Sequence, residues 1–159
     1  MLTRLCIANL AIIENVDVTF HEGFTVLTGG TGAGKSLVID SLSLLLGQRA
    51  SSELIRTGAE KATIQGIFTV DSSRLSSLLA KLDIPLENGE LCIERTITHS
   101  KNTIKANGVT LTLNALNQIA RQLADIHNQF EFAKLLNPDN YLDLVDGFSF
   151  DKVAGYKSD

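Results

Sequence analysis

The sequence predicts a mixed α/β domain with an antiparallel β portion, and three observations carry this prediction. Segments such as 3–8 and 90–98 alternate, or nearly alternate, apolar and polar residues, which is typical of half-buried strands. Other segments, such as 113–123, repeat apolar residues at helical spacing. A glycine-rich stretch stands between a strand-like segment and a helical one. Together these patterns place the chain in the α/β class.

Three strands are expected before the glycine-rich stretch. Residues 3–8 and 15–20 suit an antiparallel pair, and residues 23–28, rich in β-branched and aromatic residues, predict a buried strand. After the stretch, apolar residues recur at helical spacing until Gly47, where a helix would end in a left-handed residue. The elements expected next are a loop at 48–61, a strand at 62–70, a helix from Ser72 or Ser73 to a break at 83–85, a hairpin of strands 90–98 and 103–106, a tight turn at Asn107-Gly108, and helices at 113–123 and from Pro138.

The length and charge of the chain bound its organisation. Its 159 residues, 44% of them hydrophobic, suffice for one domain with a real core and are too few for two ordinary domains. The formal net charge of −4 argues against an overall basic surface for nucleic acid. Buried free thiols are favoured over a disulfide for Cys6 and Cys92, which are far apart in sequence. With no signal-like segment and Asp40 interrupting the longest apolar run, a cytosolic protein without a membrane span is expected.

The glycine-rich stretch is Gly29-Gly30-Thr31-Gly32-Ala33-Gly34-Lys35-Ser36, which fits the phosphate-binding loop pattern G-x-x-x-x-G-K-S/T at every specified position. The predicted strand before it and helix after it are the context that such a loop requires. A glycine-rich turn with an incidental lysine is the alternative. The flanking segments favour a nucleotide site.

Each residue type in this stretch has a chemical reason. Glycines let backbone N–H groups approach phosphate oxygens, and the N-terminus of the following helix adds unpaired N–H groups. Lys35 supplies a full charge, worth about 4 kcal/mol against a unit charge at ~4 Å and an effective dielectric of ~20. Ser36 offers a hydroxyl to Mg²⁺, which prefers hard oxygen ligands. We therefore expect residues 29–36 to bind the phosphates of ATP, with Ser36 on the metal.

Hydrolysis needs a further acidic residue that organises the metal and the water. Neither Leu144-Val145-Asp146, which sits in a helical pattern, nor Leu37-Val38-Ile39-Asp40, which lies inside the helix after the loop, is a convincing strand of this kind. The sequence also contains no Leu-Ser-Gly-Gly signature. The chain therefore looks like the first half of a split ATPase.

The ordered motifs resemble those of the RecN DNA-repair proteins, relatives of the SMC and ABC-type ATPases. The likeness spans essentially the whole chain. It rests on Leu5-Cys6-Ile7-Ala8-Asn9-Leu10-Ala11-Ile12-Ile13, Thr28-Gly29-Gly30-Thr31-Gly32-Ala33-Gly34-Lys35-Ser36, Leu54-Ile55-Arg56-Thr57-Gly58-Ala59-Glu60, Asn107-Gly108 and Asp125-Ile126-His127-Asn128-Gln129.

This resemblance implies a P-loop NTPase fold of the ABC/SMC-head type, with residues 1–150 as the N-terminal half of the head, including a mixed sheet, and 151–159 as a tail that starts a coiled coil. It implies that Gln129 contacts Mg²⁺ and the attacking water, and that Arg56 lies near the phosphates. The implied partners are the C-terminal half of the same head, a second head joined on ATP, and DNA through the full-length assembly. The implied role is repair of DNA double-strand breaks by a cytoplasmic protein that can associate with the nucleoid. The full-length protein would hydrolyse ATP, and this chain alone would bind it with little hydrolysis.

Two positions depart from the family pattern, and other interpretations stay open. Gly30 stands where the family usually has Glu, and Asn128 where it often has Gly. Gln129 also fits a solvated loop residue and Arg56 a surface arginine, while His127 is more often structural than catalytic in such a setting. The alternative functions are a transport ATPase subunit, a small nucleotide kinase, and a non-catalytic module that assembles on nucleotide.

Overall fold

The computed structural model describes residues 1–30, 34–70 and 73–124, which belong to a compact unit delimited at Met1–Asp125. The predicted boundary at residue 150 lies outside these residues, as does the predicted helix from Pro138. The described elements, in chain order, are β1 (Leu2–Leu10), β2 (Ile13–Thr19), α1 (Lys35–Leu45), the 3₁₀ turn η1 (Ser52–Leu54), β3 (Lys61–Thr69), α2 (Ser73–Lys81), β4 (Glu90–Thr98), β5 (Asn102–Ala106), β6 (Val109–Leu111) and α3 (Leu113–Leu123).

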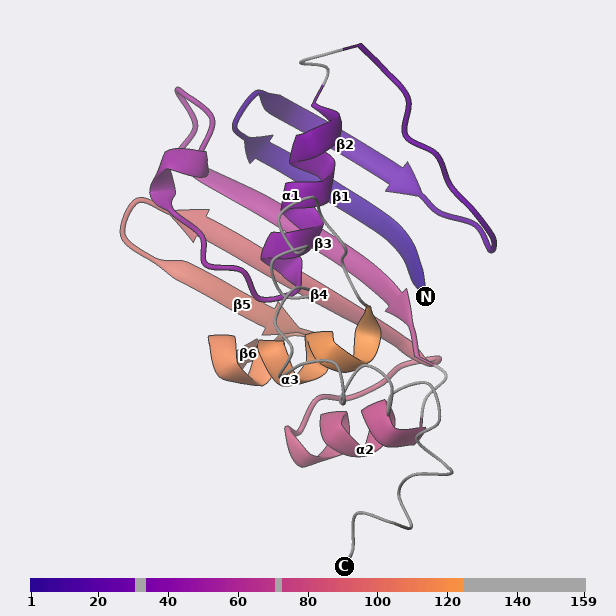
Figure 1. The fold of residues 1–159 in the computed structure, drawn as a ribbon. Helices are drawn as coiled ribbons and strands as arrows, with labels where there is room; N and C mark the ends of the chain where they lie inside the picture. Colours follow the sequence, from indigo (N-terminus) through magenta and orange to yellow (C-terminus); the bar gives the residue numbers. More distant parts are fainter. Residues whose placement is uncertain (31–33, 71–72, 125–159) are drawn as a thin grey trace, which may run out of the picture. The chain divides into compact units, whose positions relative to one another are not determined.

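The strands form a six-stranded sheet in the order β2-β1-β3-β4-β5-β6, and every neighbouring pair is antiparallel (Figure 1). The predicted pair at the N-terminus and the predicted hairpin are confirmed. The turn at Asn107 and Gly108 is also confirmed, with φ of 44° and 84°, and it leads into β6, a strand that the sequence did not predict. The mixed part of the expected sheet has no counterpart among the described residues.

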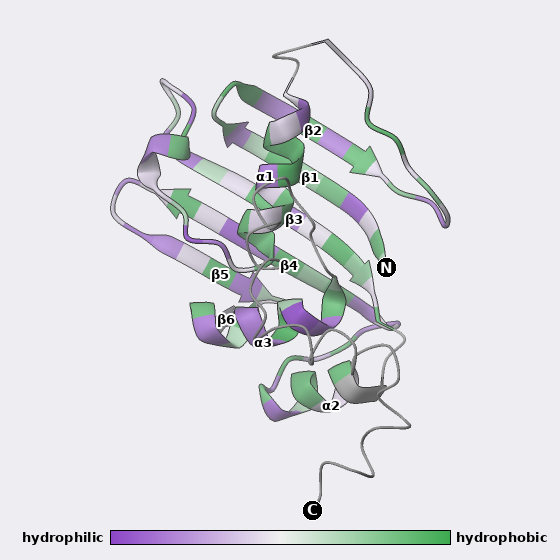
Figure 2. Ribbon diagram, in the orientation of Figure 1, coloured by the Kyte–Doolittle hydropathy of each residue, from purple (hydrophilic) through white to green (hydrophobic). Residues whose placement is uncertain are grey.

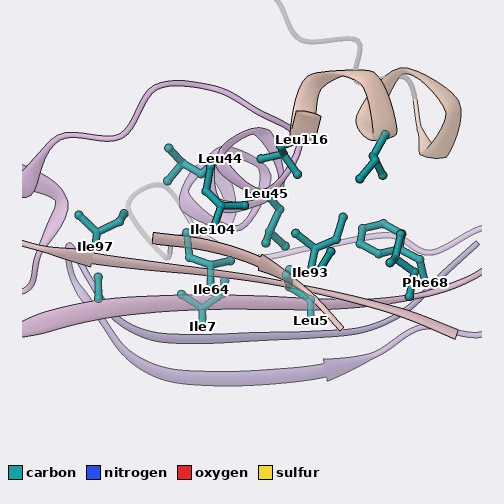
Figure 3. Packing of buried hydrophobic residues seen from close by; sticks show 14 of the residues in the cluster. Leu5, Ile7, Leu44, Leu45, Ile64, Phe68, Ile93, Ile97, Ile104 and Leu116 are labelled. Carbon is teal, nitrogen blue, oxygen red and sulfur yellow. The ribbon is translucent and has the colours of Figure 1, made fainter. Parts of the chain in front are cut away.

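One face of the sheet carries the hydrophobic core. The burial of β3 and β4 alternates strictly, because successive side chains of a strand point to opposite faces. Figure 2 shows hydrophobic bands recurring along the strands. The helices cover the buried face, and their apolar residues interlock with those of the strands (Figure 3). The core includes Leu5, Ile7, Leu44, Leu45, Ile64, Phe68, Ile93, Ile97, Ile104 and Leu116.

Glycine at position 66 lets α1 approach the sheet closely. Gly66 lies on the buried face of β3, and a Cβ atom there would stand 2.9 Å from Cδ1 of Leu45. The helix ends two residues before Gly47, whose φ of 106° is left-handed as predicted. Helix α1 is therefore seated on the sheet through its C-terminal half, where Ser41, Leu44 and Leu45 are buried.

The prediction of a buried strand at 23–28 is wrong for this structure. The segment is not in a strand, and Phe24 is 92%, Val26 61% and Leu27 42% exposed. An extended segment becomes a strand only where a neighbour supplies backbone hydrogen bonds, and no strand within the described residues pairs with this one. Figure 2 shows its apolar residues on the loop that leaves the sheet after β2.

Two further expectations concern the cysteines and membrane spans. Cys6 and Cys92 are free thiols, as the sequence favoured, although both are only partly buried. Among the helices that the structure describes, none is long and apolar enough to cross a membrane.

Candidate nucleotide-binding site

The N-terminus of α1 is built to receive an anion. Gly34 occupies the N-cap position with a left-handed φ of 84°, and as a glycine it has no side chain that could cap the helix. The backbone N–H of Val38 donates to the carbonyl of Gly34 at 3.2 Å. The N–H groups that have no partner within the helix are therefore those of the residues that precede Val38. These groups and the positive end of the helix dipole form an anion site.

Lys35 lies folded over the first residues of the glycine-rich stretch. Its Nζ donates hydrogen bonds to the carbonyl oxygens of Gly29 at 2.5 Å and Gly30 at 2.7 Å. Both oxygens are neutral acceptors, so a phosphate oxygen would offer the ammonium group a stronger, charge-assisted partner. The lysine is thus held beside the loop that the motif assigns to phosphate.

Ser36 and Gly30 are both open to solvent. Ser36 is exposed in the first turn of α1, where its hydroxyl is accessible to a hydrated metal ion. A Cβ atom on Gly30 would meet nothing within 4 Å, so the absence of the family's usual Glu is not imposed by space. Thr31, Gly32 and Ala33 lie outside the described residues. The described part of the loop fits a phosphate group with Mg²⁺.

Arg56 contacts the turn between β1 and β2. Its Nη1 donates to the carbonyl of Ile12 at 2.8 Å, its Nη2 lies 3.6 Å from Oε2 of Glu14, and its backbone N–H donates to the carbonyl of Asn9 at 2.9 Å. These contacts tie the segment around η1 to that turn. The predicted role near the phosphates stays a prediction.

Three other residues singled out in the sequence, His127, Asn128 and Gln129, lie outside the described residues. The assignment of Gln129 to the metal and the attacking water therefore stays a prediction as well.

A buried arginine closes the other end of α1, and sequence reasoning missed it. Arg95 of β4 is 2% exposed, and its Nη1 donates to the carbonyl of Leu44 at 2.5 Å and to that of Gln48. Its Nε donates to Oδ1 of Asn102 at 3.1 Å. Burial lowers the pKa of the guanidinium, which still carries its charge. The signal that could have revealed Arg95 is its position in the alternating pattern of the strand, where a charged residue stands on the buried face between Ile93 and Ile97.

The chain matches known proteins along most of its length. A family model described as an AAA domain matches residues 4–157. Over 151 residues the chain is 42% identical to the DNA repair protein RecN of Bacillus subtilis (strain 168), covering 94% of this chain and 26% of that protein. It is 34% identical to the DNA repair protein RecN of Vibrio cholerae serotype O1, covering 94% of this chain and 27% of that protein.

Solved structures of SMC heads share the fold. The Smc head domain of Pyrococcus furiosus, with an extended coiled coil and bound to the C-terminal domain of ScpA, superposes with a TM-score of 0.75 at 22% identity, over 99% of this chain and 43% of that chain. A chain from a study of ATP-driven dimerization and DNA-stimulated activation of SMC ATPases gives a TM-score of 0.67 at 24% identity, over 91% of this chain and 97% of that one.

The fold is thus that of an SMC-type ATPase head, and the chain belongs to the AAA domain family. Within that class it is homologous to the DNA repair protein RecN, which confirms the resemblance expected from its ordered motifs. The chain spans about a quarter of the length of the RecN proteins that it matches.

Proposed function

We propose that this chain is the ATP-binding N-terminal segment of the head of a RecN-like protein that acts in the repair of DNA double-strand breaks. The observation that carries the proposal is the uncapped N-terminus of α1, with Lys35 folded beside it, inside a complete phosphate-binding motif. The homology to RecN supports the repair role.

Mg-ATP would be held by the residues of the loop and the first helical turn. Backbone N–H groups of Gly29, Gly30, Thr31, Gly32, Ala33 and Gly34 would contact phosphate oxygens, Lys35 would neutralise their charge, and Ser36 would donate an oxygen to Mg²⁺. Arg56 and Gln129 complete the proposed set. Bound Mg²⁺ neutralises charge on the phosphates. The carboxylate needed for hydrolysis would come from outside this chain.

The proposed partner that completes the head is its C-terminal half. Phe24, Val26 and Leu27 expose apolar side chains on the segment before the loop, and Ile39 exposes 45% of its surface on α1. Large apolar side chains exposed in this way favour a contact site on the segment that carries them.

The remaining assignments follow from the relatives. Two heads joined through ATP and indirect contact with DNA are proposed from the described behaviour of SMC ATPases. A cytoplasmic location with nucleoid association is proposed from the homology to RecN.

Calorimetric titration of the chain with Mg-ATP tests the central proposal. Lys35→Ala should weaken binding by about two to three orders of magnitude, because a charge contact worth roughly 3–4 kcal/mol is lost. Lys105→Ala is the matched control, since Lys105 is exposed on β5 away from the loop, and it should leave the dissociation constant unchanged. Equal binding by both variants would refute the site.

A chimera tests the repair role. In the RecN of Bacillus subtilis, the 26% of the protein that this chain matches would be replaced with the matching 94% of this chain, and survival after double-strand breaks would be scored in a strain lacking its own RecN. We expect the chimera to restore survival and its Lys35→Ala version to fail. A chimera that is present at normal level and binds Mg-ATP, yet restores nothing, would count against the repair role.

A further inference from the structure

Helix α1 has two unlike ends. At its N-terminus the N-cap residue is Gly34, which has no side chain to cap the helix, while at its C-terminus the buried guanidinium of Arg95 from β4 donates to carbonyls of Leu44 and Gln48. Within the described helix Lys35–Leu45 the last turn has no basic residue, so Arg95 supplies from the sheet the positive charge that a helix C-terminus favours. An 11-residue helix is about 16 Å long, which separates Arg95 from the loop.

The guanidinium joins the end of α1 to the hairpin of β4 and β5, which is distant from the helix in sequence. Nη1 bonds the carbonyls of Leu44 in α1 and Gln48 after it, and Nε bonds the side chain of Asn102 at the start of β5. Because the fork of an arginine is planar and rigid, these bonds fix both the depth and the rotation of the helix end over the sheet. Gly66 beneath Leu45 allows the close seating that the bonds require.

The loop half of α1 is less deeply buried than the other half. The buried residues of the helix, Ser41, Leu44 and Leu45, all lie in its C-terminal part. In the loop half, Leu37 and Val38 pack against the core but are only partly buried, and Ser36 is exposed. Because a helix is rigid, contacts that fix the position of its C-terminal end also fix the position of its N-terminal end. The position of the Gly34 and Lys35 backbone therefore depends on the contacts made at Leu44 and Gln48.

From this geometry we infer that Arg95 is a positioning residue for the nucleotide site, acting through α1 on the N–H groups and the lysine that would hold phosphate. The inference rests on the proposed function, because it assigns a remote residue to the same Mg-ATP site. The hydrogen bonds of Arg95 go to Leu44, Gln48 and Asn102, and none goes to the residues of the loop that the structure describes, so its effect on affinity is indirect.

The test compares three variants with a destabilised control. Arg95→Met keeps the volume and removes every donor, Arg95→Lys keeps the charge with a single nitrogen, and Asn102→Ala removes only the acceptor of Nε. The control is Leu79→Ala, a cavity in α2 at a fully buried position. Mg-ATP affinity is measured by calorimetry at a temperature at which circular dichroism shows each variant folded.

We expect Arg95→Met to weaken Mg-ATP binding about tenfold and Arg95→Lys about threefold, with Asn102→Ala between wild type and Arg95→Lys. Leu79→Ala should lower the melting temperature without changing the dissociation constant. A purely structural role would lower stability in all variants and leave affinity unchanged, and this result would overturn the inference. If Arg95→Met does not fold, the inference is tested by comparing the Mg-ATP dissociation constants of Arg95→Lys and Leu79→Ala, and equal values would overturn it.

A second readout needs no nucleotide. The amide of Val38, bonded to Gly34 in the first turn of α1, should exchange its hydrogen at least several-fold faster in Arg95→Lys than in Leu79→Ala, relative to amides of β3 in each variant. Equal relative exchange would overturn the inference. Failure of the wild-type chain to bind Mg-ATP would instead overturn the proposed function, and the exchange of Val38 would still decide whether Arg95 positions the loop.

Discussion

Gly47 lies so close to Asn117 of α3 that a Cβ atom on the glycine would stand 1.8 Å from the amide Oδ1. The same residue has a φ of 106°, a conformation that side chains rarely adopt. Position 47 is thus restricted twice, once by the contact with α3 and once by its own backbone. This contact joins the segment just after the C-terminal end of α1 to α3.

Replacing Gly47 with alanine should destabilise the chain by about 2–4 kcal/mol, measured by urea unfolding, because both restrictions act at once. The double variant Gly47→Ala with Asn117→Ala separates them. Removing the amide relieves the collision and leaves the backbone strain, so we expect roughly half of the lost stability to return. A double variant no more stable than Gly47→Ala would show that the backbone conformation accounts for the whole loss.

Gly30 and Gly34 form a natural pair for testing the loop. A Cβ atom on either would meet nothing within 4 Å, but only Gly34 has a left-handed φ, of 84°. Gly30→Ala should therefore leave the melting temperature unchanged. Gly34→Ala should cost about 1–2 kcal/mol, because the left-handed conformation is strained for alanine. Thermal unfolding without nucleotide is the measurement, and equal effects at both positions would contradict the backbone argument.

The side chain of Asn107, the residue after β5, bonds both the start of β4 and the segment before it. Its Nδ2 donates to the carbonyls of Pro85 at 2.6 Å and Glu90 at 3.0 Å, and its Oδ1 accepts from the backbone N–H of Cys92 at 2.7 Å. Asn107→Gly removes these bonds while tolerating the φ of 44°, and should cost about 2–3 kcal/mol by urea unfolding.

Asn107→Asp is the matched variant for that site. It keeps an acceptor for Cys92 and loses both donations, leaving a carboxylate beside two carbonyl oxygens. Asn107→Asp should be at least as destabilising as Asn107→Gly at neutral pH. In acid, where the protonated carboxyl can donate a hydrogen bond, it should regain part of the lost stability. Stability close to wild type for either variant would rule out the side chain as a structural link.

The ion pair of Arg4 and Asp17 predicts a pH dependence. Nε and Nη2 of the arginine donate to the two carboxylate oxygens at 2.9 and 2.5 Å, and this pairing holds the pKa of Asp17 below its ordinary value. A lowered folded-state pKa means that the stabilisation is fully present above about pH 4 and is lost as the pH falls through the folded-state value.

The melting-temperature difference between wild type and Asp17→Asn should therefore be constant from about pH 5 upward and shrink in stronger acid. Both groups are exposed, so the difference should be small and should decrease with added salt. A difference that grew as the pH fell below 4 would have the wrong sign for this pair.

The exposed residue Phe24 offers a test of the proposed partner. Because 92% of its surface is exposed, Phe24→Asp should leave the unfolding free energy of this chain within about 0.5 kcal/mol of wild type. In the chimeric RecN described above, the same change should reduce the amount of folded protein, since the C-terminal half of the head would meet a charge in place of an apolar side chain. Glu22→Asp is the neighbouring control. Unchanged folding of the chimera would argue against this surface as the contact.

The sequence by itself determined five of the six strands of the antiparallel sheet, β1 to β5, together with the turn at Asn107, the left-handed end of α1 and the phosphate-binding motif. Each depends on information that is local in sequence: the two-residue alternation of a strand, the preference of glycine and asparagine for left-handed backbone, and a fixed spacing of glycines before a lysine. The same local reasoning predicted a strand at 23–28 and was wrong there, because strand formation also needs a neighbour.

Only the tertiary structure decided which groups bind the C-terminal carbonyls of α1 and where the side chain of Lys35 lies. Arg95 is 51 residues away from Leu44 in sequence, and nothing local to either residue requires that they meet. The contact exists because the sheet brings β4 beneath the end of α1, and because burying a charge is tolerated only where acceptors surround it. Such a pairing is a property of the packed chain, since the acceptors are backbone carbonyls that every residue possesses.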